Sequence, residues 1–143
     1  MWKRFRSIVV IIVMAGIAFS LGRTFGQPHR RIQRFGMVIG VRPEMIEEYR
    51  RLHAEPWPGV VNMIRACNIR NYSIYLKEIE HGKYYLFAYF EYVGGDLDAD
   101  MAKMAADPTT QEWWKHTDPC QTPVPMRGDG EFWASMEEVF HID

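Results

Sequence analysis

The amino-acid sequence predicts one α+β domain with a ferredoxin-like order of elements, preceded by an N-terminal hydrophobic helix. Two observations predict this class. The chain has 143 residues, which is room for one domain and little more. From Phe35 onward, segments in which apolar side chains alternate with period two are separated twice by segments with helical spacing. The resulting order, β-α-β-β-α-β, is that of the ferredoxin-like fold.

The first half of the domain is predicted to supply a strand, two helices and a second strand, at residues 35–41, 43–53, 60–67 and 69–77. In the first strand, large side chains alternate with small ones, which is typical of a strand with one buried face. Pro43 suits the first turn of the first helix, where its missing N–H costs nothing. Pro56 and Pro58 interrupt the helical pattern, so we expect two helices here and not one.

The second half is predicted to supply a strand, two more helical segments and a last strand, at residues 83–93, 97–104, 107–114 and 132–142. His81 and Gly82 form the turn before the first of these strands. Asp107 is a good helix N-cap and is followed by Pro108 at the first helical position. The Pro and Gly content of residues 118–130 predicts a loop.

The predicted strand at residues 83–93 is apolar or aromatic on both faces. A sheet of this kind buries one face under its own helices, so its other face needs a ligand, a lipid or a second copy. We therefore expect a homodimer that packs sheet to sheet.

An apolar run at residues 7–22 follows three basic residues near the N-terminus. This pattern is typical of a signal peptide or a membrane anchor. The run would make only about 24 Å of helix, short of the ~30 Å hydrocarbon core of a membrane. We expect residues 1–22 to be a signal peptide or anchor, with possible membrane attachment through residues 7–22. Residues 23–34 then form a basic linker, residues 35–143 form the domain, and the protein is exported.

The charge balance of the predicted domain excludes one class of partner. All eighteen Asp and Glu residues lie from Phe35 onward, together with ten of the seventeen Lys and Arg residues. The domain therefore carries a net charge of about −8 on residue counts. Because nucleic-acid binding needs a basic face, we expect no nucleic-acid partner.

Neither a metal nor a cofactor is predicted. The histidines are scattered, no CxxC or HxxxH spacing occurs, and the chain has no Gly-rich phosphate loop. The two cysteines, Cys67 and Cys120, are too few for a disulfide framework. We expect free buried thiols, with a single bridge between them left open as the alternative.

Five residues are candidates for a site: Tyr49, His53, Tyr72, Trp113 and Trp114. Tyr49 and His53 are four residues apart, so they share one helix face, and an imidazole beside a phenol suits proton transfer near neutral pH. Tyr72 shares a strand face with two aliphatic residues, and the Trp pair offers flat platforms for a sugar ring. Each of these residues has a structural alternative, as a core or interface side chain.

The chain resembles the L-rhamnose mutarotase family from about Phe35 to Ile142. The resemblance is carried by five segments: FGMVIGV, EEYRRLHAEPWP, NYSIYL, TTQEWWKHTD and MEEVFHID. It implies a dimeric α/β barrel that interconverts the α and β anomers of L-rhamnose or a similar pyranose without a cofactor. It also implies that His53 is the proton donor and that Tyr49, Tyr72, Trp113 and Trp114 bind substrate.

Two features depart from the family pattern. Residues 1–34 precede the first strand, and the segments 94–107 and 120–130 are longer or altered. Two other functions remain open at this point. One is a cofactor-free monooxygenase on the same dimeric barrel, and the other is a non-catalytic, exported sugar-binding domain.

Overall fold

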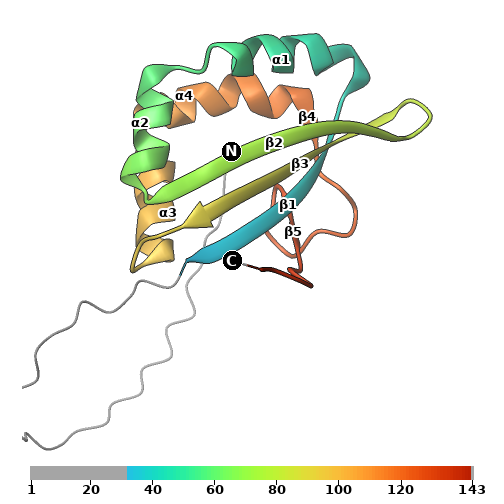
Figure 1. Cartoon of the computed structure of the whole chain (residues 1–143). Helices are drawn as coiled ribbons and strands as arrows, with labels where there is room; N and C mark the ends of the chain where they lie inside the picture. The colour runs from blue at the N-terminus through green and yellow to red at the C-terminus, as the bar shows by residue number, and fades with distance from the viewer. Residues whose placement is uncertain (1–31, 143) are drawn as a thin grey trace, which may run out of the picture.

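The computed structural model describes residues 32–142, so the predicted N-terminal helix and most of the linker lie outside the described residues. Figure 1 shows the chain, in which a curled sheet carries four helices. The elements are, in order, β1 (Gln33–Val41), a 3-10 turn (Pro43–Met45), α1 (Ile46–Ala54), α2 (Pro58–Ala66), β2 (Ile69–Glu80), β3 (Lys83–Tyr92), α3 (Leu97–Ala106), α4 (Pro108–Thr117), a 3-10 turn η2 (Asp118–Cys120), β4 (Gln121–Thr122) and β5 (Ala134–Met136).

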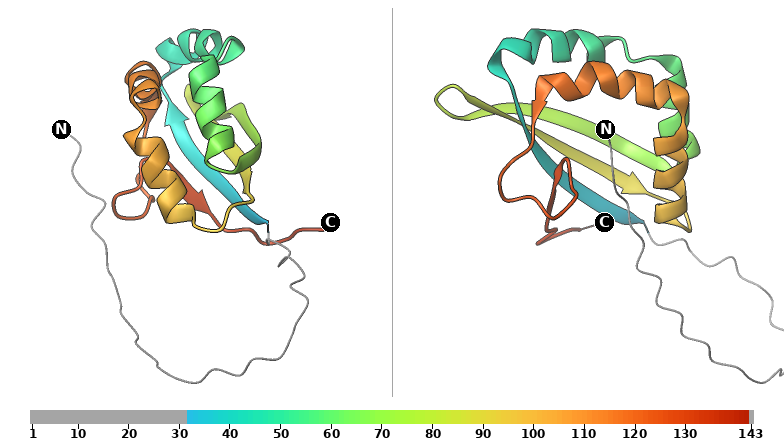
Figure 2. Two further views of the ribbon diagram at one scale, coloured as in Figure 1. Left: turned by 90° about the vertical axis from the view of Figure 1, so that its left-hand side faces the viewer. Right: turned by 180° about the vertical axis from the view of Figure 1, so that it is seen from behind.

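The strands form one antiparallel sheet in the order β2-β3-β1-β4, and β5 also pairs with β1. The helices gather on one side of this sheet, as the two further views in Figure 2 also show. The predicted α+β class is therefore confirmed. The Asp107 carboxylate caps α4 by accepting from the backbone N–H of Thr110 at 2.7 Å, as the sequence predicted. The helix predicted at 60–67 begins earlier, because Pro58 occupies its first turn.

Two predicted elements differ from the structure. The last strand is limited to Ala134–Met136, and residues 137–142 have no regular structure, although the sequence alternation had predicted a strand as far as residue 142. No strand of the described part of the protomer pairs with them, and alternation alone does not make a ladder. The predicted loop at 118–130 also begins with η2 and the short strand β4. β4 pairs with Gly40, where a Cβ would lie 2.8 Å from the Thr122 carbonyl oxygen.

The core lies between the helices and one face of the sheet. On β3 the side chains that face the helices are buried: Leu86, Ala88, Phe90 and Tyr92. Alternate residues of the same strand point to the other face and are only half-buried, namely Tyr85, Phe87 and Tyr89. Both cysteines are buried and free, so the alternative of a bridge between them is not realised. None of the helices in residues 32–142 is long and apolar enough to cross a membrane.

A β-bulge in β2 sets which residues of that strand face the helices. The register with β3 shifts between Arg70 and Ser73, and Asn71 has a positive φ of 48° inside the shift. The extra residue at the bulge breaks the simple alternation. Tyr72 consequently lies on the same face as Ile69, three residues earlier, and its ring meets the ring of Phe90 edge-on at 5.8 Å.

Tyr92 ties the end of β3 to α3. It is fully buried, and its hydroxyl donates to Asp100 Oδ2 at 2.7 Å while it accepts from the backbone N–H of Asp96 at 3.0 Å. The side-chain amide of Asn68 donates to the same Asp100 oxygen at 2.7 Å. This network holds the start of α3 against the end of the sheet.

We expect Tyr92→Phe to lower the free energy of unfolding by about 1–3 kcal/mol, because two buried hydrogen bonds lose their shared hydroxyl. Urea unfolding followed by circular dichroism measures the change. The matched control is Tyr75→Phe, at a position that is 63% exposed, which should change the value by less than about 0.5 kcal/mol. Equal stability of the two variants would contradict the role given to Tyr92.

Candidate active site

Tyr49 and His53 meet on α1, as their spacing predicted. Their rings stack with centroids 4.1 Å apart and planes at 25°. Tyr49 is 6% exposed and belongs to the core, whereas His53 is half-buried above it. The polar residues Glu47, Arg50 and Arg51 lie on the exposed face of the same helix. The amphipathic pattern of α1 thus turns both candidate residues toward the protein.

The imidazole of His53 is held in one tautomer. Its Nδ1 lies 2.9 Å from the backbone carbonyl oxygen of Tyr49, one turn earlier. Because a carbonyl oxygen only accepts, Nδ1 carries the proton and donates it. Nε2 is then the nitrogen that gains or loses a proton as His53 titrates.

An aromatic cluster extends from His53 to α4. The edge of the His53 ring meets Trp113 at 5.4 Å, and Trp113 meets Trp57 at 5.4 Å in the same geometry. Trp57 also contacts His116 at 5.5 Å. We call this set the aromatic cluster: Tyr49, His53, Trp57, Trp113 and His116. It joins α1, the start of α2 and α4.

Gly59 allows the helices of the cluster to approach closely. It lies in the first turn of α2, two residues after Trp57, and a Cβ there would be 2.9 Å from the Thr109 methyl carbon of α4. A larger side chain would therefore push α2 away from α4. The spacing between Trp57 and Trp113 depends on this contact.

The structure places the other two predicted site residues beside the cluster. Tyr72 reaches the same side of the sheet, and its phenol is close enough to raise the pKa of Tyr49, after the larger effect of burial. Burial of its own hydroxyl raises the pKa of Tyr72 to about 12. The residue as a whole is 41% exposed. Trp114 is half-buried and packs against the main core next to Trp113.

Three residues near the site were not predicted from the sequence. Trp57 and His116 belong to the aromatic cluster, and the side chain of Gln121 forms a hydrogen bond to the Tyr49 hydroxyl that opposes the rise of its pKa. Gln121 is 6% exposed. Trp57 lies in the segment EPWP, and His116 directly follows WWK. Their position in these two distinctive segments could have identified them as candidates from the sequence. Gln121 lies in a segment predicted as loop and had no signal.

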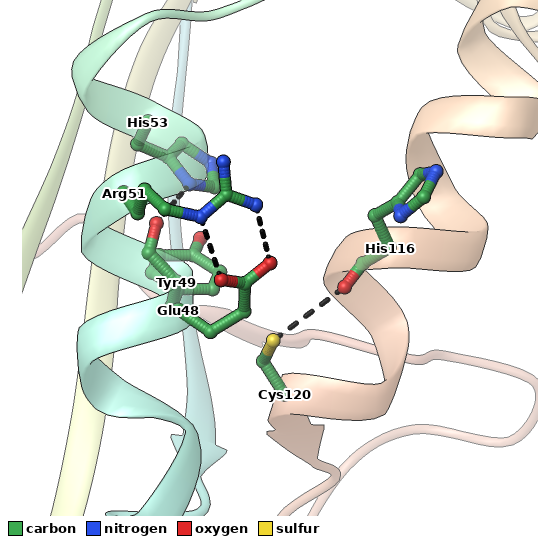
Figure 3. Close-up of polar contacts among 6 residues, drawn as sticks. All are labelled: Glu48, Tyr49, Arg51, His53, His116 and Cys120. Carbon is green, nitrogen blue, oxygen red and sulfur yellow. Dashed lines mark hydrogen bonds and ion pairs between the residues drawn. The ribbon is translucent and has the colours of Figure 1, made fainter.

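An ion pair lies between α1 and the end of α4 (Figure 3). Glu48 accepts two hydrogen bonds from the Arg51 guanidinium, at 2.6 and 2.7 Å, which lower its pKa. The Cys120 thiol lies on the other side and donates to the His116 carbonyl oxygen at 3.5 Å. The Glu48 carboxylate is near enough to act on both His116 and Cys120 electrostatically. The Glu48 carboxylate therefore lies beside the aromatic cluster with the Arg51 guanidinium as its counter-ion.

Burial controls the protonation of the polar groups. It lowers the pKa of His53 from its ordinary value of 6.5, against the smaller opposing effect of the bond to the Tyr49 carbonyl. It raises the pKa of Tyr49, so the phenol stays protonated at neutral pH. Burial also raises the pKa of Asp118, at the end of α4, to about 6. The site thus combines a neutral imidazole with protonated phenols at pH 7.

Two surface hollows lie elsewhere on the domain. One, of about 340 Å³, is lined by residues 125–132 of the last loop. The other, of about 240 Å³, lies between β1, β3 and the C-terminal segment. Within residues 32–142 no group of three or more His, Cys, Asp or Glu side chains is placed to hold a metal ion.

Comparison with protein families shows to which family this chain belongs. The profile of the L-rhamnose mutarotase family matches residues 34–142, which include α1, the aromatic cluster and β2. The chain belongs to the L-rhamnose mutarotase family. The family that the sequence segments resembled is therefore the correct one.

Individual L-rhamnose mutarotases agree with this assignment. The protein of Oceanobacillus iheyensis is 30% identical over 112 residues, which are 78% of this chain and 100% of that protein. The protein of Bacillus subtilis is 30% identical over 115 residues, with the same coverage. The crystal structure of an L-rhamnose mutarotase from Formosa agariphila shares the fold, with a TM-score of 0.57 and 21% identity over 78% of this chain and 99% of that chain.

The prediction of an exported location is contradicted by these relatives and is withdrawn. The family match begins at residue 34, after the predicted leader. The proteins of Bacillus subtilis and Klebsiella pneumoniae are covered over 100% and 97% of their own lengths. The match to this chain therefore accounts for all or nearly all of these two relatives, which leaves no room in them for a counterpart of the segment on which the prediction of export rested. Residues 1–31 themselves lie outside the described residues.

We expect the His53 ring to titrate with a midpoint below 6.5 in the folded protein, because burial disfavours its charged form. Two-dimensional NMR of the imidazole carbons and protons, with His53→Asn to assign the signal, measures this midpoint. In urea the same signal should return to about 6.5. The unfolded chain then binds the extra proton, so the contribution of His53 to stability is present above pH 6.5 and is lost as the pH falls below it. A folded midpoint above 6.5 would contradict the burial argument.

Proposed function

We propose that this protein interconverts the α and β anomers of L-rhamnose or a closely similar pyranose, with His53 as the acid–base group. One observation supports the choice of His53: its ring stacks on Tyr49 beside Trp113, in a chain of the L-rhamnose mutarotase family. The enzyme is thus an isomerase that acts on carbohydrates. The monooxygenase and the non-catalytic binding domain, the two alternatives, gain no support from the family match.

The chemistry requires two proton transfers. The imidazolium of His53 gives one proton to the ring oxygen and the anomeric hydroxyl loses one to a solvent water, so that the ring opens to an aldehyde, which turns and closes on its other face. With Nδ1 committed to the Tyr49 carbonyl, Nε2 of His53 is the atom that exchanges a proton. Because closure is the reverse of opening, the imidazolium that donates to the ring oxygen in one direction is the imidazole that accepts in the other. The lowered pKa makes the imidazolium a stronger acid.

The remaining proposed residues bind and orient the sugar. The hydroxyls of Tyr49 and Tyr72 are protonated at neutral pH and suit hydrogen bonds to sugar hydroxyls. The indole faces of Trp113 and Trp114 offer apolar surface for the C–H face of a pyranose. Holding the ring in one orientation next to Nε2 adds positioning to the acid–base effect.

We also propose that residues 35–143 are the working domain and that it acts as a homodimer. The helix-facing side of β3 is buried, while three aromatic side chains on its other side are only half-buried in one protomer. A second copy packed against that face would remove them from water. The two sites would then lie on opposite outer sides of the dimer, each built by one chain.

We expect His53→Ala to lower the rate of L-rhamnose anomer exchange by about 10²–10⁴-fold, the usual contribution of a general acid–base group. NMR saturation transfer between the two anomeric protons measures the rate with and without protein. The matched control is His81→Ala, in the exposed turn after β2, which should keep the native rate. Equal exchange with and without the native protein would remove the proposed activity, and a native rate in His53→Ala would remove the role of His53.

We expect Tyr72→Phe to raise KM by about 5–20-fold with a smaller change in kcat, since it removes one hydrogen bond to substrate. The same exchange assay over a range of L-rhamnose concentrations separates the two constants. Tyr75→Phe is the matched control, because it makes the same change on the opposite face of β2. Equal effects of the two variants would show that the hydroxyl of Tyr72 does not contact the sugar.

A further inference from the structure

Gln121 is a polar residue in the core of the domain. It is 6% exposed, although a glutamine side chain ordinarily lies at the surface. Burying a carboxamide is costly unless its polar atoms have hydrogen-bond partners. The partner here is the hydroxyl of Tyr49, a residue that is also only 6% exposed. The hydrogen bond therefore joins two buried side chains, one of which is a candidate site residue.

Backbone contacts on two sides hold Gln121 in place. It opens β4 and pairs with Val41 at the end of β1. Immediately before it, the carbonyl oxygen of Cys120 accepts from the backbone N–H of Arg42 at 2.9 Å. Cys120 is fully buried, and its thiol donates to the His116 carbonyl oxygen of α4 at 3.5 Å. Because both the sheet and α4 fix this part of the backbone, the carboxamide of Gln121 stands at a defined position.

The direction of the hydrogen bond decides what the Tyr49 hydroxyl can offer to a ligand. A phenol has one proton to donate and also accepts, whereas a carboxamide donates with its nitrogen and accepts with its oxygen. Burial raises the pKa of Tyr49, and the bond to Gln121 acts in the opposite direction and lowers it. A bond that favours the phenolate is one in which the amide N–H donates to the phenol oxygen. The phenolic proton of Tyr49 is then left for another acceptor.

A second phenol lies near the Tyr49 hydroxyl. Tyr72 acts electrostatically on Tyr49, and burial raises the pKa of Tyr72 itself to about 12. The His53 ring stacks on the ring of Tyr49, with centroids 4.1 Å apart. A group that fixes the Tyr49 hydroxyl therefore acts on the side chain that joins the second phenol to the imidazole.

We infer that Gln121 is a positioning residue of the site, whose amide N–H holds the Tyr49 hydroxyl so that the phenolic proton is directed to a hydroxyl oxygen of the bound sugar. This inference rests on the proposed function of the site, and it gives Gln121 no contact with the reacting atoms. An apolar side chain in its place would leave the Tyr49 hydroxyl to be oriented each time a sugar binds. The affinity for the sugar would fall by the free energy of that ordering.

The first test is a double-mutant cycle between Gln121 and Tyr49. It is read on the Kd of L-rhamnose for the full chain, from a chemical-shift titration, and on KM and kcat of anomer exchange. Gln121→Met, an uncharged change of similar length, should raise Kd and KM by about 3–10-fold with a smaller change in kcat. Tyr49→Phe should raise them by about 5–20-fold, and the double variant should lose no more than Tyr49→Phe alone, because Gln121 acts through that hydroxyl. The matched control is Gln33→Met, at an exposed position that begins β1, which should keep the native constants.

The second test addresses the direction of the hydrogen bond with Gln121→Glu at pH 8. A carboxylate only accepts, so it would take up the phenolic proton of Tyr49. L-rhamnose should then bind more weakly than it binds to Gln121→Met, by about 3-fold or more. Gln33→Glu is the control for the added charge. An affinity of folded Gln121→Glu equal to or above that of Gln121→Met would overturn the inference, and if the buried charge unfolds this variant, the uncharged cycle decides.

The outcomes separate this inference from the proposed function. Additive losses in the double variant, or native constants in Gln121→Met, would overturn the inference and leave the function standing. A native chain that binds L-rhamnose with coupled losses in the cycle, yet does not exchange its anomers, would overturn the function alone. A native chain that neither binds nor exchanges L-rhamnose would overturn both.

Discussion

The hydrogen bond from His53 Nδ1 to the Tyr49 carbonyl oxygen sets the chemistry of the site. The acceptor is the carbonyl of the residue one turn earlier on the same helix, α1. The bond fixes the tautomer, and the stack of the imidazole on the buried Tyr49 ring fixes its plane. A single helical turn therefore determines both which nitrogen of His53 carries the bound proton and how the ring lies. The aromatic cluster and the rest of the site are arranged around this one ring.

The core beneath the site holds these groups in place. Tyr49 is a core residue as well as a site residue, so the packing of Ile39, Leu86 and Trp113 against it also positions His53. The close contact at Gly59 brings Trp57 to Trp113, and the bulge at Asn71 turns Tyr72 to the same side of the sheet. The close contact and the bulge both fix the backbone, and this keeps the geometry of the large aromatic side chains defined. Burial then lowers the pKa of His53 and raises those of the tyrosines.

The two faces of the sheet differ in what covers them. One face lies under the helices and forms part of the core. Tyr72 lies on this face, where its ring contacts Phe90. The other face carries rings that no helix of the described part covers, together with a C-terminal segment of exposed apolar residues. A strand with aromatic residues on both sides is therefore economical in a small domain. It closes the core on one face and leaves half-buried aromatic rings on the other.

The sequence by itself determined the elements, the family and the spacing of the main site residues. Four-residue spacing on a helix is local geometry, so the meeting of Tyr49 and His53 followed from it, as did the cap at Asp107. Tertiary structure alone decided which distant groups join them. Trp57, His116 and Gln121 reach the site through contacts between helices and through pairing of β4 with β1, and no local pattern encodes such contacts. The last strand was predicted to be longer than it is, also because pairing is not encoded locally. Alternation describes side chains, whereas a strand also needs a neighbouring backbone.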